Sequence, residues 1–260
     1  MKRSELEKSF QKALKDGEFH VWYQPQVDMR TGRPRGAEAL ARWKKEDGTY
    51  IMPSLFVPEL ERAGLMTLLD EEVIGIVCRD LRDARREEIP FAPVSINLSR
   101  LHAGRREIAE RFKEITERYG TDRRELSFEI TETAAKETGD SDMAQLVRYL
   151  HGGGYRIAVD DYGMGCSTLK LLQEISFDIL KLDRYFVSRI GEPKADVILA
   201  STIRMAEELG MDVVAEGVET EEQIRFLLNH RCRYGQGYYY SEPLPKERYI
   251  RWRQAYETAV

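Results

Sequence analysis

The chain alternates short β-rich runs with amphipathic stretches, and this alternation limits its fold more than any other feature. Stretches such as REIAERFKEITERYG and KADVILASTIRMAEELG have the spacing of helices, and the second ends at Gly210, a residue typical of helix C-termini. Runs with the composition of strands occupy residues 20–27, 35–43, 92–99, 125–132, 155–161, 178–184, 212–218 and 235–240. About eight strands alternating with helices in 260 residues favour an α/β fold, a TIM-type (β/α)8 barrel, over an open sheet.

The first two strands depart from that regular scheme. Their connection, VDMRTGRPRG, is too short to hold the crossover helix that a parallel pair requires. We therefore predict a modified barrel whose first strand is antiparallel. Residues 1–18 are predicted to form a lead-in helix, a connector from an upstream domain, and residues 19–260 to form the barrel.

Composition excludes several classes of protein. Hydrophobic residues make up 42% of the chain, enough for a sizeable core, and the formal net charge is −5 without a dense basic block that would bind nucleic acid. Cys78, Cys166 and Cys232 are scattered, which is typical of reduced thiols rather than of a disulfide framework. No apolar run approaches the ~20 residues that span a bilayer. We expect a cytoplasmic segment without membrane contact, or the cytoplasmic portion of a larger, membrane-attached protein.

Polar residues gather at the ends of the predicted strands. In a barrel of this kind the carboxyl ends of the strands meet at one rim, where active sites are built. Any one such residue is more often an exposed edge residue or an ion-pair partner than a functional group. Together, however, they indicate a site: Glu38, Asn97, Glu129, Asp160, Asp161, Lys181, Glu216 and Gln236.

Two adjacent carboxylates raise the question of what balances their charge. In RIAVDDYGMG (156–165) an apolar run ends at Asp160 and Asp161. Carboxylates with an amide oxygen form a hard ligand set that suits Mg²⁺ or Mn²⁺, and the four histidines lack the paired spacing of a zinc site. Two successive aspartates could reach two metals about 3.5–4 Å apart. Divalent cations would then cancel the repulsion and couple metal binding to phosphate binding.

The residues at these positions resemble a known family. The motif Glu38-Ala39-Leu40-Ala41-Arg42 follows Tyr23-Gln24-Pro25. Further matching stretches are MPSLFVPELERAGL (52–65), VSINLS (94–99), FEITET (128–133), DDYGMGCSTL (160–169), LKLDRYFV (180–187), AEGVET (215–220) and GQGYYYSEPL (235–244). In this order and spacing they resemble the EAL domain, the cyclic di-GMP phosphodiesterase family, over almost the whole chain.

The resemblance implies hydrolysis of cyclic di-GMP to linear pGpG with two Mg²⁺ or Mn²⁺ ions per site. It places Glu38, Asn97, Glu129 and Asp160 on one metal. Asp160 and Asp161 share the second, with Glu216 linked directly or through water. Lys181 contacts the attacking water or the scissile phosphate, which makes Lys181, Glu216, Asp161 and Glu38 the catalytic set. The general base stays open between Glu216, an aspartate and a metal-bound hydroxide.

Substrate contacts are implied for Gln24, Leu40, Arg42, Ser99, Glu219 and Gln236. The planar guanidinium of Arg42 suits a non-scissile phosphate. Glu132 resembles the residue that anchors the loop after Asp161. That loop departs from the family's usual Asp-Asp-Phe-Gly-Thr-Gly-Tyr/Phe-Ser, because it has Tyr162, Met164 and Cys166. We interpret these changes as drift among packing residues, with an effect on regulation as the alternative.

A second reading of function is a degenerate EAL module that binds cyclic di-GMP or a protein without catalysis. Degenerate members lose metal ligands or the lysine, and this chain retains all of them, which favours the enzyme. The resemblance also implies a homodimer, an upstream sensor or cyclase-type domain, and inhibition by Ca²⁺, whose larger and looser coordination would disturb a paired-metal site.

Overall fold

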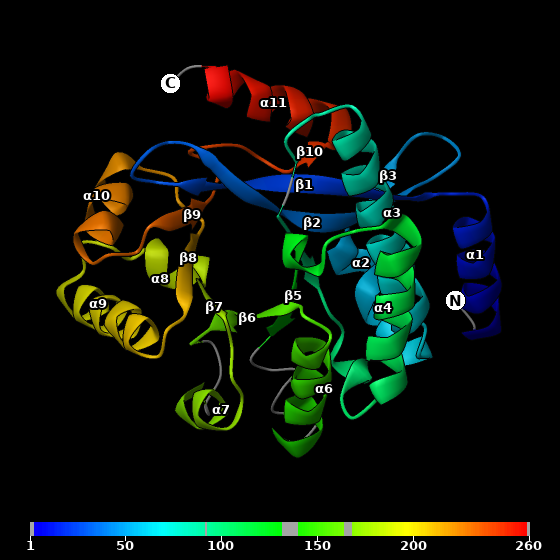
Figure 1. Cartoon of the computed structure of the whole chain (residues 1–260), viewed down its shortest axis with the longest axis horizontal. Coiled ribbons are helices and arrows are strands. Elements are labelled where there is room, and N and C mark those ends of the chain that lie inside the picture. Colours follow the sequence, from blue (N-terminus) through cyan, green and yellow to red (C-terminus); the bar gives the residue numbers. More distant parts are fainter. Residues whose placement is uncertain (1–2, 92, 132–139, 164–167, 259–260) are drawn as a thin grey trace.

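The structure is a computed structural model that describes residues 3–91, 93–131, 140–163 and 168–258 (Figure 1). The helices are α1 (Arg3–Lys15), α2 (Pro53–Ala63), α3 (Met66–Arg86), α4 (Arg106–Tyr119), α6 (Asp140–Gly152), α7 (Thr168–Glu174), α8 (Arg184–Val187), α9 (Pro193–Glu208), α10 (Glu221–Asn229) and α11 (Lys246–Thr258), with 3-10 turns η1 (Arg100–His102) and η2 (Arg123–Glu125). The strands are β1 (Phe19–Asp28), β2 (Pro34–Lys44), β3 (Tyr50–Ile51), β4 (Val94–Asn97), β5 (Leu126–Thr131), β6 (Arg156–Tyr162), β7 (Ile179–Leu182), β8 (Asp212–Glu216), β9 (Tyr234–Gln236) and β10 (Leu244–Pro245).

The strands close into a barrel in the order β1-β9-β8-β7-β6-β5-β4-β2, and β1 pairs with β2 to complete the ring. β1 is antiparallel to both neighbours, whereas β2 and β4 to β9 run parallel to one another. The prediction of a modified TIM-type barrel with an antiparallel first strand is confirmed. β3 and β10 extend the sheet beyond the ring, and α11 lies against β1 and β10 (Figure 1).

The last barrel strand is shorter than its sequence indicated. The run 235–240 was expected to be extended throughout, but β9 ends at Gln236. The chain then turns, since the N–H groups of Tyr240 and Ser241 both donate to the carbonyl of Gly237. A Cβ on Gly237 would lie 2.2 Å from the carbonyl oxygen of Val218. Glycine at this position therefore allows the close approach that brings Gln236 to the barrel rim.

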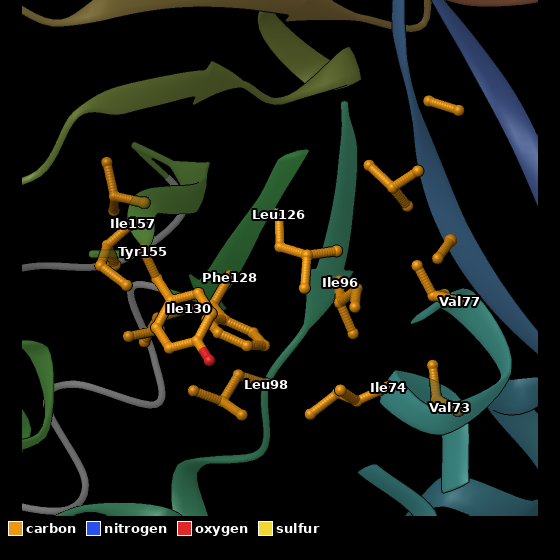
Figure 2. Close-up of a cluster of buried hydrophobic side chains, with 14 of the residues drawn as sticks. Val73, Ile74, Val77, Ile96, Leu98, Leu126, Phe128, Ile130, Tyr155 and Ile157 are labelled. Atoms are coloured by element: carbon orange, nitrogen blue, oxygen red, sulfur yellow. The ribbon is translucent and has the colours of Figure 1, made fainter. Parts of the chain in front are cut away.

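The main core lies between the outer face of the barrel and its helices. Figure 2 shows Val73, Ile74 and Val77 of α3 in one cluster with Ile96 of β4 and Leu98, which follows that strand. These side chains are buried, because the i, i+3, i+4 spacing of α3 turns one apolar stripe toward the strands. The core fixes α3 against β4, and both elements contribute to the cavity described below.

The interior of the barrel is divided into layers. Ala158 of β6, Ile179 of β7 and Val214 of β8 form a small apolar cluster together with Tyr234. Strand side chains on one face recur every second residue. The next inward positions on β6, β7 and β8 are therefore Asp160, Lys181 and Glu216. This periodicity places charged groups at the carboxyl ends of the strands, above an apolar layer.

The N-terminal helix packs on the barrel through an aromatic cluster. The ring of Phe10 in α1 lies 5.4 Å from Phe19 and 6.4 Å from Trp43, and Phe56 of α2 is 5.8 Å from Trp43. Phe10 is fully buried. The division between residues 1–18 and 19–260 stays a prediction, although α1 shares this core. Among the helices in the described ranges, none combines the length and apolar character needed to cross a lipid bilayer.

Candidate active site

The site is built around the side chain of Lys181, which β7 holds inside the barrel. Its ammonium nitrogen lies 2.6 Å from a carboxylate oxygen of Glu129 and 2.7 Å from one of Glu216. Glu38 and Asp160 follow at 3.5 and 3.4 Å. Burial alone would lower the pKa of Lys181, but the surrounding carboxylates outweigh it and hold that pKa well above its ordinary value. The residue is therefore a fixed positive charge.

Glu38 is held by side-chain amides from two other strands, β4 and β9. Asn97 Nδ2 donates to Glu38 Oε1 at 2.8 Å, and Gln236 Nε2 donates to Glu38 Oε2 at 2.6 Å. The same Gln236 nitrogen is 3.0 Å from Gln24 Oε1. Burial raises the pKa of Glu38, but Lys181 and these hydrogen bonds bring it below the usual value. Because Asn97 donates to Glu38 through Nδ2, its amide oxygen stays available as a ligand.

The backbone of β6 brings two consecutive aspartates to one side. In a regular strand their side chains would point to opposite faces. Asp161, however, has a φ of +53°, and the pairing of β6 with β7 shifts between Val159 and Tyr162. Ligand oxygens of Asp160, Asp161 and Glu216 consequently lie within 4.8 Å of one another. Left-handed backbone at a residue other than glycine is strained, and such strain clusters at functional sites.

The electrostatics of the cluster favour a cation. Burial raises the pKa of Glu216 to about 8, and Asp160 and Glu38 add to this effect against Lys181. Burial, followed by the charge of Asp160, raises the pKa of Asp161 to about 6. In both cases burial and the neighbouring carboxylates together outweigh the opposing effect of Lys181. The buried Oε1 of Glu129 also has no hydrogen-bond partner among the described residues.

These groups fit hard divalent cations. The grouped oxygens of Asp160, Asp161 and Glu216, together with the unpartnered Oε1 of Glu129 and the amide oxygen of Asn97, form an oxygen-only donor set. Mg²⁺ and Mn²⁺ prefer such ligands. A bound divalent cation would stabilise the ionised forms of Glu216 and Asp161, which burial and the neighbouring carboxylates disfavour.

A cavity of about 620 Å³ opens beside the carboxylates. Its walls are largely apolar, and Leu40, Val57 and Leu69 are among its lining residues. Polar groups at its edge include Glu38, Asn97, Ser99 and Asp70. The volume and the few convergent polar groups are typical of a small-molecule site.

Arg42 is buried on β2, two residues after Leu40 and on the same face of the strand. Only 4% of its surface is exposed, and its Nη1 donates to the carbonyl of Ala41 at 2.9 Å. Its Cζ lies 5.1 Å from the ring of Trp22, and its buried Nε has no partner among the described residues. A buried guanidinium with an unused donor is suited to an anionic ligand group.

The structure brings most of the sequence-derived residues together. The eight strand-end residues and Gln24 form one connected cluster, and Leu40 and Ser99 line the cavity. Glu219 is exposed and is not among the cavity-lining residues. Tyr162 is buried at the end of β6. Glu132, Met164 and Cys166 lie outside the described residues, so the expectations about them are unchanged.

One cavity residue, Asp70, was missed by the sequence reasoning. It lies on α3 with Val73, Ile74 and Val77 at helical spacings of three, four and seven residues. An acidic residue in the middle of an apolar stripe is rarely placed there without a partner. That signal is present in LLDEEVIGIV and would have identified Asp70.

Comparisons with known proteins identify the family of this chain. The model of the EAL domain family matches residues 7–243, and the chain belongs to this family. It is 34% identical over 244 residues to "Probable cyclic di-GMP phosphodiesterase PdeB" of Escherichia coli (strain K12), covering 94% of this chain and 46% of that protein. It is also 34% identical over 245 residues to "Oxygen sensor protein DosP" of the same organism, covering 94% of this chain and 30% of that protein.

A solved structure gives the same picture. "PaMucR Phosphodiesterase, c-di-GMP complex" superimposes with a TM-score of 0.85 at 29% identity, covering 94% of this chain and 99% of that one. The chain spans less than half the length of PdeB and DosP, so the similarity concerns only a part of each of those proteins.

Proposed function

We propose that this chain is a metal-dependent phosphodiesterase that hydrolyses cyclic di-GMP to linear pGpG. The observation that carries the proposal is Lys181 among four carboxylates at the barrel rim, beside a cavity of suitable size. The name of PdeB and the cyclic di-GMP complex of MucR support the choice of substrate.

The proposed metal ligands are Glu38, Asn97, Glu129 and Asp160 for one divalent ion, and Asp160, Asp161 and Glu216 for a second. Two bound Mg²⁺ or Mn²⁺ ions would lower the pKa of a water molecule and offset charge on the reacting phosphate. Ca²⁺ is proposed to inhibit.

Lys181 would keep a positive charge next to the reacting phosphate and the incoming water. Its raised pKa keeps the ammonium protonated, so its role is electrostatic and it does not act as a base. Proton removal falls to the carboxylates, of which Glu216 has a raised pKa and partial access to solvent. The barrel holds these groups before substrate arrives, so little reorganisation accompanies the reaction.

The remaining substrate contacts follow from position. The unused Nε of Arg42 fits a phosphate oxygen that is not cleaved. Leu40 and Ser99 line the cavity and would contact a base or ribose. Gln236 donates to the Glu38 carboxylate and also to Gln24, and both amides are proposed as further contacts to the substrate. A contact from the exposed Glu219 remains part of the proposal.

We further propose that the chain acts in the cytoplasm as a homodimer within a longer protein. PdeB and DosP are more than twice as long as the matched segment. The exposed apolar side chains of Leu169, Val197 and Ile198, on α7 and α9, are consistent with a subunit contact.

The test is turnover of cyclic di-GMP by the purified chain with Mg²⁺ or Mn²⁺, with pGpG followed by chromatography. EDTA is expected to stop the reaction, and replacing Mg²⁺ by Ca²⁺ is expected to suppress it. Binding of cyclic di-GMP without any pGpG, in a folded metal-loaded sample, would instead establish a non-catalytic binding module.

A further inference from the structure

A buried acid and imidazole pair lies at the edge of the cavity, away from the carboxylate cluster. Asp70 of α3 lines the cavity and is 5% exposed, while His102 at the end of η1 is completely buried. His102 Nε2 lies 2.6 Å from Asp70 Oδ2. Neither residue contributes to the proposed metal chemistry, so the pair needs a separate explanation.

The two oxygens of Asp70 have different surroundings. Oδ2 accepts hydrogen bonds from His102 Nε2 and, at 3.2 Å, from the backbone N–H of Ser99. Oδ1 has no hydrogen-bond partner in the described part of the chain. It is not fully buried, so it keeps some exposed surface. Because Asp70 lines the cavity, that open oxygen is accessible from the cavity.

His102 is in a position to fix this orientation. Its Nδ1 is buried without a partner among the described residues, and the ring of Phe112 is 5.9 Å away. A proton on Nδ1 would be a buried donor without an acceptor, so the ring carries its proton on Nε2 and donates to Asp70. Ser99 also caps η1, since its Oγ accepts from the N–H of Leu101. The carboxylate is thus held from behind by one side chain and one backbone group.

We infer that His102 is a positioning residue that aims the free oxygen of Asp70 at the N–H edge of one guanine base. This inference rests on the proposed function. Guanine carries adjacent N–H donors on that edge, whereas adenine presents a ring nitrogen acceptor there. A carboxylate oxygen bonds the first and repels the second. The apolar side chains of Val57, Leu69 and Val73 provide faces against which a flat base packs.

The discrimination has a physical basis in burial. A site built to accept a hydrogen bond from its ligand rejects an analogue that lacks the donor, because the buried acceptor is left unpaired. Burial raises the pKa of Asp70, and the hydrogen bonds from His102 and Ser99 oppose that rise. His102 therefore supports Asp70 both in orientation and in charge.

If the pair of Asp70 and His102 had only a structural role, the variants would behave differently. As a tie between α3 and the turn after β4, the pair would affect folding but not the preference between bases. Asp80 offers a matched control, because it is a buried carboxylate on the same helix that accepts from Tyr23 at 2.6 Å and Lys246 at 2.9 Å, away from the cavity.

The experiment compares kcat/KM for cyclic di-GMP and cyclic di-AMP in the unchanged chain and in variants, each checked for folding. The unchanged chain is expected to prefer guanine by about 100-fold or more. Asp70→Asn should reduce this preference to within about tenfold, mainly by raising KM for the guanine substrate. Asp80→Asn should leave the preference unchanged even if it lowers the melting temperature.

Two variants separate positioning from packing at His102. Glutamine places an N–H donor close to the position of Nε2, whereas leucine fills space without a donor. His102→Leu is expected to raise KM for cyclic di-GMP about tenfold with little change in kcat, and His102→Gln to stay within about threefold of the unchanged chain. Equal effects of both variants would overturn the positioning role.

Failure of this inference is distinguishable from failure of the proposed function. If the unchanged chain hydrolyses cyclic di-GMP and Asp70→Asn retains the full base preference, base reading by Asp70 is wrong. If no hydrolysis occurs, calorimetric binding of the two dinucleotides with Mg²⁺ present tests the same preference directly. Binding of neither dinucleotide would overturn both proposals.

Discussion

Two layers inside the barrel are two residues apart on the same three strands, and they differ in polarity and charge. Ala158, Ile179 and Val214 form a packed apolar layer. The next inward positions on β6, β7 and β8 carry a carboxylate, an ammonium and another carboxylate. The three strands are the same in both layers, so side-chain chemistry is the main difference between the core and the site; the irregular backbone after Val159 of β6 is a second one.

The difference shows how the barrel separates stability from reactivity. Apolar burial in the lower layer stabilises the closed ring in proportion to the area removed from water. The upper layer buries several carboxylates around the single ammonium of Lys181, an arrangement that opposes folding unless cations complete it. In a third region, at the opposite end of the barrel, positive charge exceeds negative charge, because Arg35 and Arg156 share the carboxylate of Asp212.

The largest effect is expected from removing the ammonium of the upper layer. Lys181→Met should lower kcat by about 100- to 1,000-fold, because a fixed charge beside the reacting phosphate is lost. In EDTA it should also destabilise the protein by about 3 kcal/mol near neutral pH, since buried carboxylates lose their partner. Turnover assays and chemical denaturation measure the two effects.

The matched control lies one layer below on the same strand. Ile179→Val removes one buried methyl group and should cost about 0.5–1.5 kcal/mol of stability with kcat unchanged. If Ile179→Val reduced turnover as severely as Lys181→Met, the functional separation of the two layers would be disproved.

The second prediction concerns pH in the metal-free protein. The folded pKa values of Glu216, about 8, and Asp161, about 6, lie above those of ordinary carboxyl groups in an unfolded chain. Between about pH 4 and pH 8 the folded state therefore binds protons that the unfolded state has released. Stability should fall as pH rises through this window, because a higher pH favours the state that binds fewer protons, here the unfolded state.

Melting temperatures in EDTA test this dependence. A fall of several degrees is expected between about pH 5.5 and pH 8. Mg²⁺ should restore more stability at the higher pH, because it binds the ionised carboxylates. Glu216→Gln, which imitates the protonated side chain, should flatten the upper part of the curve. A metal-free protein that becomes more stable across this range would contradict the electrostatic account of the upper layer.

The contrast between the layers also separates what the sequence could predict from what it could not. Strand periodicity placed Glu38, Lys181 and Glu216 at one rim, and the short link between the first two strands indicated their antiparallel pairing. These inferences needed only local spacing and chain length. The pairing of Asp70 with His102 joins α3 to η1 across 32 positions of sequence, and no local pattern specifies that partner.

Backbone conformation was equally hidden from the sequence. Two adjacent aspartates raised the question of charge balance, but strand alternation would have sent them to opposite faces. The left-handed φ of Asp161 decides the matter, and it depends on the irregular pairing of β6 with β7. In the same way, the expected extension of the last strand failed because a turn at Gly237 follows Gln236 immediately.

The smallest effect is expected at the opposite end of the barrel. Arg35 and Arg156 each donate to Asp212 Oδ2, at 2.7 and 2.8 Å, and all three side chains are partly exposed. Ion pairs open to solvent contribute little, so Asp212→Asn should cost at most about 1 kcal/mol. The change should also leave kcat and the affinity for Mg²⁺ as they are, because the apolar layer lies between Asp212 and Lys181. Denaturation with and without about 0.5 M salt would show whether the small loss is electrostatic, since salt screens exposed charges. A marked loss of turnover in a folded Asp212→Asn protein would mean that the lower layer transmits changes instead of isolating the two ends, and the division of the barrel into independent layers would have to be abandoned.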